Sequence, residues 1–148
     1  MDSGHFRRSW SFRRWHTVRH VLTWMLCVPL LAGCLLLSGA QQSADRAEDA
    51  GNVSVQFVSA EGTEVREVTV ADAATNVLVT VFARSEQGQL RIEILDPQGS
   101  ATLVIEGTPE EQVARATVAT DDNGVLRYRI KATGARRGGF QILYQPAS

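Results

Sequence analysis

Alternation of apolar and polar residues is the feature of this sequence that most limits what it can fold into. The clearest stretch is residues 126–132, where apolar side chains alternate with basic ones. A period of two places the apolar side chains on one face of a β-strand and the polar ones on the other. Residues 53–57, 68–70, 90–94 and 140–145 alternate in the same way. The chain therefore reads as a series of short strands, each with one buried face.

Between these strands lie one longer apolar run and several turn signals. Residues 75–84 read TNVLVTVFAR, which predicts a central strand buried on both faces. Asp96-Pro97-Gln98-Gly99 and Gly134–Gly139 are expected to be turns, and Asn123-Gly124 is the strongest short hairpin signal. About eight strands without a long helix predict an all-β fold over residues 52–148, an antiparallel β-sandwich or jelly roll.

The first 40 residues differ sharply from the rest in charge. They hold five arginines and one acid, whereas residues 41–148 hold ten basic and fifteen acidic residues. Residues 21–37 carry no charge and are mostly apolar. A basic start before a short apolar run is typical of a secretory signal, and this run is too short for a comfortable membrane span. The pattern predicts export across a bacterial cytoplasmic membrane, with residues 1–33 as the signal peptide.

The apolar run ends with Leu31-Ala32-Gly33-Cys34, an aliphatic residue, two small residues and a cysteine. This motif resembles the lipobox of bacterial lipoproteins. The resemblance implies that Cys34 receives a diacylglyceryl group, becomes the new N-terminus and anchors the protein at the outer face of a membrane in the cell envelope. Residues 34–51 are expected to be a lipid-anchored flexible tether, because QQSADRAEDAG in their second part is polar and does not alternate.

A second cleavage position stays open. Ser38-Gly39-Ala40 places small residues where ordinary signal peptidase reads them. Cleavage after Ala40 would release a soluble, secreted accessory domain that binds carbohydrate or protein. Three leucines follow Cys34, where mature lipoproteins usually become polar, so the sequence leaves both forms in view.

Two stretches of the exported part carry a second resemblance. Leu90–Gly99 contains a strand of the L-x-I-x-I kind followed by Asp-Pro-x-Gly, and Gly138–Tyr144 contains a late Gly-x-Phe strand. Their order is similar to that in the bacterial pre-peptidase C-terminal domain and related small jelly rolls. The resemblance implies a jelly-roll fold and a non-catalytic accessory role.

Composition excludes several kinds of chemistry. Every histidine, cysteine, tryptophan and methionine lies before residue 41. Residues 41–148 therefore cannot form a Ser–His–Asp or Cys–His site, or a zinc site with nitrogen or sulfur ligands. We expect a binding or structural module that has a partner in the cell envelope and is not an enzyme. A carboxylate-based hydrolase is the remaining catalytic alternative. The acidic balance argues against nucleic acid as a partner.

Two surface sites are candidates. One turn contains the oxygen ligands of Asp121, Asp122 and Asn123, which suit calcium, the only cofactor that the sequence suggests. The alternative is a type I′ hairpin at Asn123-Gly124 with exposed acids. A cluster of basic residues is the candidate surface for an anionic partner such as lipid headgroups. Its members are Arg127, Arg129, Lys131, Arg136 and Arg137.

Aromatic residues offer little for sugar binding. A sugar site usually needs exposed aromatic rings, and residues 41–148 contain no tryptophan. The remaining aromatic side chains lie on strand faces that the alternation predicts to be buried, so we expect them in the core. They are Phe57, Phe82, Tyr128, Phe140 and Tyr144.

Overall fold

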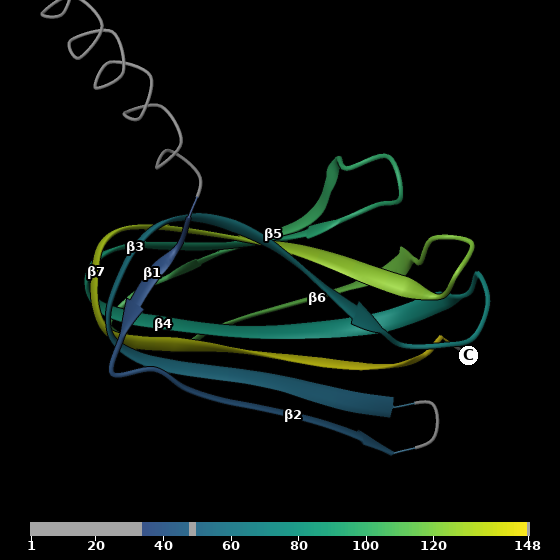
Figure 1. Ribbon diagram of the computed structural model, residues 1–148, viewed down its shortest axis with the longest axis horizontal. Helices are drawn as coiled ribbons and strands as arrows, with labels where there is room; N and C mark the ends of the chain where they lie inside the picture. The colour runs from purple at the N-terminus through teal and green to yellow at the C-terminus, as the bar shows by residue number, and fades with distance from the viewer. Residues whose placement is uncertain (1–33, 48–49, 148) are drawn as a thin grey trace, which may run out of the picture. The chain divides into compact units, whose positions relative to one another are not determined.

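The computed structural model describes residues 34–47 and 50–147, and in this part the chain is all-β (Figure 1). The strands are β1 (Leu36–Ser38), β2 (Gln41–Ala47), β3 (Ala50–Thr69), β4 (Asn76–Leu95), β5 (Ala101–Gly107), β6 (Gln112–Ala119) and β7 (Val125–Pro146). All pairings between these strands are antiparallel. The predicted fold class is confirmed. The predicted signal peptide lies outside the described residues.

Three long strands, β3, β4 and β7, run through both layers of the sandwich. The N-terminal half of β3 pairs with the C-terminal half of β7, and the C-terminal half of β3 pairs with the N-terminal half of β7. β4 pairs with both halves of β7 in the same way. The first layer has the order β2-β3-β7-β4-β6, and the second has the order β1-β3-β7-β4-β5. Figure 1 shows the three long strands curling over together at one end.

The curl corrects two sequence expectations. Gly134–Gly139 was expected to be a turn between two strands, but it lies inside β7. Residues 84–90 likewise lie inside β4 and do not separate two strands. Gly88 has φ +72°, and a Cβ there would collide with the backbone carbonyl of Gly134, so the bend at which β4 and β7 stay paired requires glycine. Bends thus join three pairs of expected strands into β3, β4 and β7, and with β1 and β2, which the sequence did not predict, the described residues form seven strands.

The Asn-Gly turn also differs from its prediction. Asn123-Gly124 connects β6 in the first layer to β7 in the second, so it closes no hairpin. Gly124 has φ +70° whereas Asn123 does not have a positive φ, which excludes a type I′ turn. The backbone amides of Val70 and Ala71 both donate to the carbonyl of Gly124, so the turn packs against the loop after β3.

Residues expected to form a tether are ordered strands. Residues 41–47 of β2 pair with residues 50–56 of β3, and β1 pairs with residues 59–61 of the same strand. The flexible tether predicted for residues 34–51 is therefore wrong where β1 and β2 lie. Pairing with β3 satisfies the backbone of a segment whose side chains gave no alternating signal.

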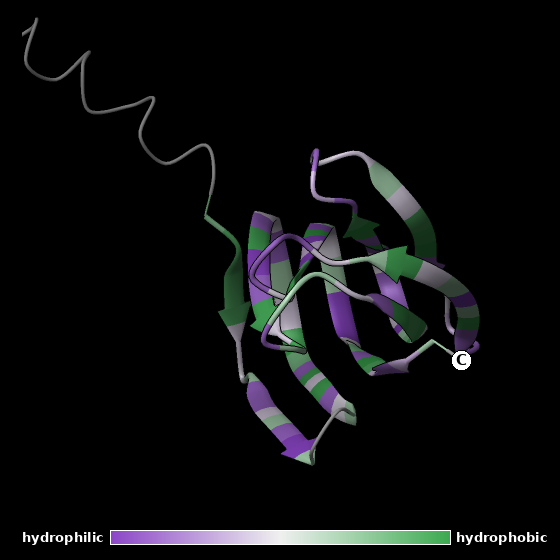
Figure 2. Ribbon diagram, turned by 90° about the vertical axis from the view of Figure 1, so that its right-hand side faces the viewer, coloured by the Kyte–Doolittle hydropathy of each residue, from purple (hydrophilic) through white to green (hydrophobic). Residues whose placement is uncertain are grey.

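The core lies between the two layers and follows the predicted alternation. Figure 2 shows hydrophilic and hydrophobic residues alternating along the strands. Val55, Val79 and Ile142 of the first layer face Ile92 and Ile130 of the second, and each is almost fully buried. Among the described residues, no helix has the length and hydropathy needed to cross a membrane.

Candidate functional site

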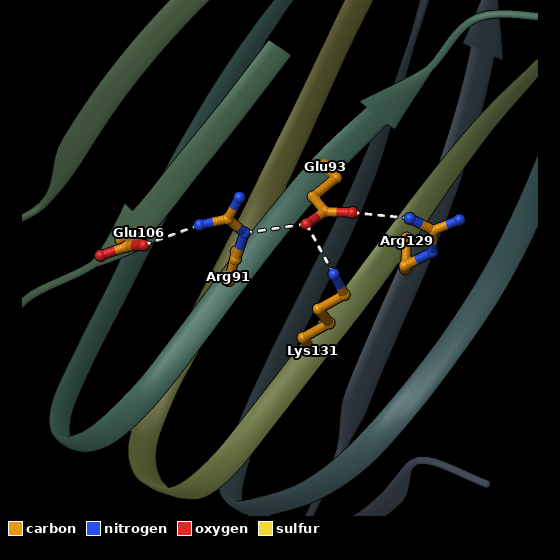
Figure 3. Close-up of polar contacts among 5 residues, drawn as sticks. All are labelled: Arg91, Glu93, Glu106, Arg129 and Lys131. Atoms are coloured by element: carbon orange, nitrogen blue, oxygen red, sulfur yellow. Dashed lines mark hydrogen bonds and ion pairs between the residues drawn. The ribbon is translucent and has the colours of Figure 1, made fainter. Parts of the chain in front are cut away.

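The outer face of the second layer is charged, and its centre is the buried carboxylate of Glu93 on β4 (Figure 3). Its side chain is only 4% exposed. Oε1 of Glu93 lies 2.8 Å from Nε of Arg91 and 2.8 Å from Nζ of Lys131, and Oε2 lies 2.8 Å from Nη1 of Arg129. Arg91 also reaches Glu106 on β5 at 3.0 Å. These five residues are named the Glu93 network.

The network holds Glu93 ionised. Burial alone would raise the pKa of this carboxyl, but hydrogen bonds from Lys131, Arg91 and Arg129 outweigh that effect and lower its pKa from 4.5 to about 2. With three cations bound to it, the ionised carboxylate of Glu93 only accepts hydrogen bonds, and both of its oxygens are already engaged. Glu93 is thus unsuited to act as an acid or base toward a ligand at neutral pH.

The basic cluster predicted as an anionic surface is divided by the structure. Arg129 and Lys131 pair with Glu93, and Arg127 pairs with Glu67 at 2.9 Å. The other two basic residues lie apart from these, at the bend of β7, where Nε of Arg137 lies 2.8 Å from Glu86. The five predicted residues therefore form no single basic surface, because acids on neighbouring strands neutralise most of their charge.

The turn predicted to bind calcium uses its first acid for its own structure. Oδ1 of Asp121 accepts hydrogen bonds from the backbone amides of Asn123 and Val125 at 3.0 and 2.9 Å. Oδ2 lies 3.5 Å from Nη2 of Arg127. A calcium ion would have to displace these contacts, so this arrangement offers no ready-made site.

Asp121→Ala should lower the free energy of unfolding by about 1–2 kcal/mol, because two backbone amides of the turn lose their acceptor. The matched variant Asp122→Ala, in the exposed neighbouring position, should change it by less than about 0.5 kcal/mol. Urea unfolding followed by far-UV circular dichroism measures both. Calcium at millimolar concentration should leave the melting temperature unchanged, and a clear rise would support the calcium prediction.

The outer face of the first layer differs in kind, because amides and hydroxyls dominate its centre. The outward side chains of β3 are Asn52, Ser54 and Gln56, and Gln141 of β7 lies beside them. Nε2 of Gln141 donates to Oδ1 of Asn52 at 3.0 Å. The two outer faces of the sandwich are thus chemically distinct, one paired by charge and the other polar and largely uncharged.

This face contains a hollow of about 220 Å³, which we name the polar hollow. Its lining comes from β3, β4, β7 and the loop before β6. The lining residues are Ser54, Gln56, Phe82, Arg84, Glu111, Arg137, Gly138, Gly139, Phe140 and Gln141. Among the described residues, the side chains of Ser54, Gln56 and Glu111 make no hydrogen bond to another part of the chain.

Phe82 is the aromatic residue whose position the sequence did not indicate. Four of the five aromatic residues are buried as predicted, and Tyr128 packs against Phe140 edge to face at 6.1 Å. Phe82 instead points outward from β4, is half-buried and lines the polar hollow. Its neighbours Val81 and Ala83 face the core, so it occupies the outward position within an apolar run.

The hollow does not assemble the acid pair of a glycosidase. Glu111 is the one carboxylate in its lining, whereas that chemistry needs two carboxyl groups facing each other across a substrate. Elsewhere in the described residues, no group of three or more His, Cys, Asp or Glu side chains could hold a metal ion.

Cys34 lies at the beginning of the ordered domain. It is exposed, and its backbone carbonyl packs against Gly62 at the bend of β3. Leu35 and Leu37, which follow it, pack against the core, whereas Leu36 is 69% exposed. The three leucines after Cys34 thus belong to the folded domain.

Comparisons with known proteins give neither a family nor a ligand. The sequence matches no family profile and no curated protein. Structures similar to it include a carbohydrate-binding module of Cellvibrio mixtus lichenase 5A in complex with cellotriose, at 18% identity over 76% of this chain and 91% of that one, with a TM-score of 0.40. The xylan-binding domain CBM22-1 of Paenibacillus barcinonensis Xyn10C has 11% identity over 77% of this chain and 87% of that one, with a TM-score of 0.37.

A third similar structure is an enzymatically active domain, that of bacteriophage CBA120 tailspike protein 4. It has 14% identity over 76% of this chain and 19% of that one, with a TM-score of 0.36. Likenesses at this level carry no argument about ligand or activity. The class of the protein is set by its own strand pairing, which is that of an antiparallel β-sandwich domain.

Proposed function

We propose that this chain is an exported protein, anchored by a lipid on Cys34, that presents a non-catalytic β-sandwich binding module at the outer face of a bacterial membrane. The observation that carries the anchoring is the position of Leu35 and Leu37, which pack against the core directly after Cys34. A mature chain that begins at Cys34 keeps both side chains. Mature lipoproteins usually become polar after the cysteine, whereas leucines follow Cys34 here. This departure then has a structural reason, since the leucines belong to the fold.

The alternative cleavage after Ala40 is disfavoured by the same observation. It would remove all of β1 together with Leu35 and Leu37. The core near Ala60 of β3, which pairs with Leu37, would lose its cover and meet water. A secreted domain of this kind would lack part of its own second layer.

Anchoring at Cys34 also fixes how close the domain lies to the membrane. β1 begins at Leu36, two residues after Cys34, so no long linker stands between the lipid and the sandwich. The binding half of the proposal is supported by the polar hollow, whose unpartnered hydroxyl, amide and carboxylate face solvent. A protein of this design would hold its ligand close to the membrane surface.

Lipid labelling tests the anchor. Cells that express the full chain are fed an alkyne-tagged fatty acid, and the tag is detected on the purified protein. We expect labelled wild type and unlabelled Cys34→Ala. Cys27→Ala is the matched control and should keep its label, because Trp24-Met25-Leu26 before it lacks the small residues of a lipobox. Unlabelled wild type would defeat the proposal.

A further inference from the structure

We infer that the polar hollow on the outer face of the first layer binds a neutral saccharide. The inference deepens the proposed binding role and does not depend on the lipid anchor. It combines three observations on the hollow, namely its unpartnered polar groups, its aromatic side and its balanced charge. Each is independent of the distant structural likenesses.

The first observation is the hydrogen-bonding capacity of the hollow. Ser54 offers a hydroxyl, and the carboxamides of Gln56 and Gln141 each offer a donor and an acceptor. A saccharide hydroxyl also donates and accepts, so it matches groups of this kind without a charge on either side. The side chains of Ser54 and Gln56 have no partner elsewhere in the described chain, so a ligand would add bonds without breaking internal ones.

Gly139 determines where the amide of Gln56 lies. A Cβ on Gly139 would come within 2.6 Å of the Gln56 carboxamide, so that amide folds over the space left by the missing side chain. The two residues are paired across β3 and β7. The carboxamide of Gln56 therefore lies against the wall of the hollow, within reach of a ligand.

The second observation is the aromatic side of the hollow. Phe82 is half-buried and contributes its side chain to a lining in which most of the other side chains are polar. Pockets that hold small molecules combine an apolar surface with a few placed polar groups, and the C–H face of a sugar ring fits an aromatic ring. The volume of about 220 Å³ suits one or two sugar units and leaves the rest of a longer chain on the open sheet.

The third observation is the charge of the hollow. Its two cations, Arg84 and Arg137, both pair with the carboxylate of Glu86, at 3.1 and 2.8 Å. Glu111 is the one acid in the lining itself. Counted together with Glu86, which pairs with both arginines beside the hollow, two positive and two negative charges balance, so the site lacks the excess of cations that recognises a phosphate or a uronate. This balance favours a neutral ligand over an acidic one.

Calorimetric titration of the full chain tests the inference. The protein is purified in a zwitterionic detergent, because maltoside detergents are themselves saccharides. The probes are neutral hexasaccharides of glucose, mannose and N-acetylglucosamine, with hexagalacturonate as the acidic comparison. We expect at least one neutral probe to bind with a Kd below about 1 mM and more tightly than hexagalacturonate. If no neutral probe binds, or if the acidic one binds best, the inference is overturned.

Two variants locate the binding. Gln56→Ala removes an unpartnered amide, and Phe82→Leu keeps apolar bulk but removes the aromatic face. Each should weaken binding at least about fivefold. Gln145→Ala, on the same sheet face outside the hollow, and Val65→Ala, on the second layer, should leave the Kd unchanged. Equal binding by all four variants would place the ligand elsewhere and overturn the inference, whereas the result of lipid labelling would be unaffected.

Discussion

Glu93→Gln is expected to lower the free energy of unfolding by about 2–3 kcal/mol at pH 7. The substitution keeps the shape of the side chain but removes the charge that Arg91, Arg129 and Lys131 share. The lowering of the pKa of Glu93 from 4.5 to about 2 corresponds to at most about 3 kcal/mol. Loss of one partner from a fully buried pair can cost more, but these cations are 28–43% exposed and regain water.

The effect should depend on pH in a defined direction. Because the pKa of folded Glu93 lies below its ordinary value of 4.5, the ionised carboxylate stabilises the folded state at every pH above about 4.5. This contribution is lost as the pH falls from about 4.5 to about 2. The stability difference between wild type and Glu93→Gln should therefore be constant from pH 7 to about pH 5 and shrink below that.

The matched control is Glu106→Gln, at the exposed end of the same network. Glu106 is 69% exposed and contacts only Arg91, so its loss should cost less than about 0.5 kcal/mol. Urea unfolding followed by far-UV circular dichroism, repeated at pH 7, 5 and 3, measures all three proteins. A Glu93→Gln variant as stable as Glu106→Gln, or a difference that grows toward acid pH, would contradict this account of the network.

The sequence predicted the layers of this fold well but not its connections. Alternation identified the buried face of the alternating segments correctly, because the period of two is set locally by backbone geometry. The alternation did not distinguish a bend within one strand from a turn between two strands. Gly88 and Gly134 have the positive φ angles that a turn would also use, and whether the chain then turns back or continues depends on pairing with distant strands. The same reason explains why Asn123-Gly124 crosses between layers.

The candidate sites were harder to predict, because their character depends on side chains from neighbouring strands. Lys131 reads as a free cation in sequence, yet it pairs with Glu93, 38 residues away. Phe82 reads as core because the residues around it are apolar, but it pairs with Val113 of β6 and Gln141 of β7 on the outer face of the sheet. One signal was available in the outward positions of residues 52–56 and 140–145, which carry asparagine, serine and glutamine in place of charges.

Removing the two leucines that flank Leu36 gives the second large effect. Leu35→Ala/Leu37→Ala should lower the free energy of unfolding by about 2–4 kcal/mol, because both side chains are half-buried against the core. Leu36→Ala is the matched control. Its side chain is 69% exposed, so we expect a change below about 0.5 kcal/mol. Urea unfolding of the three full-length chains gives the comparison.

The consequence for processing makes this measurement informative. If Leu35 and Leu37 contribute this much, cleavage after Ala40 would yield a domain that has lost both side chains and the pairing of β1 with β3. A loss of about 2–4 kcal/mol is a large part of the 5–15 kcal/mol that holds a typical domain folded. A chain that starts at Cys34 keeps the full second layer. If the double variant were as stable as Leu36→Ala, β1 would be dispensable and the structural argument for an anchor at Cys34 would fail.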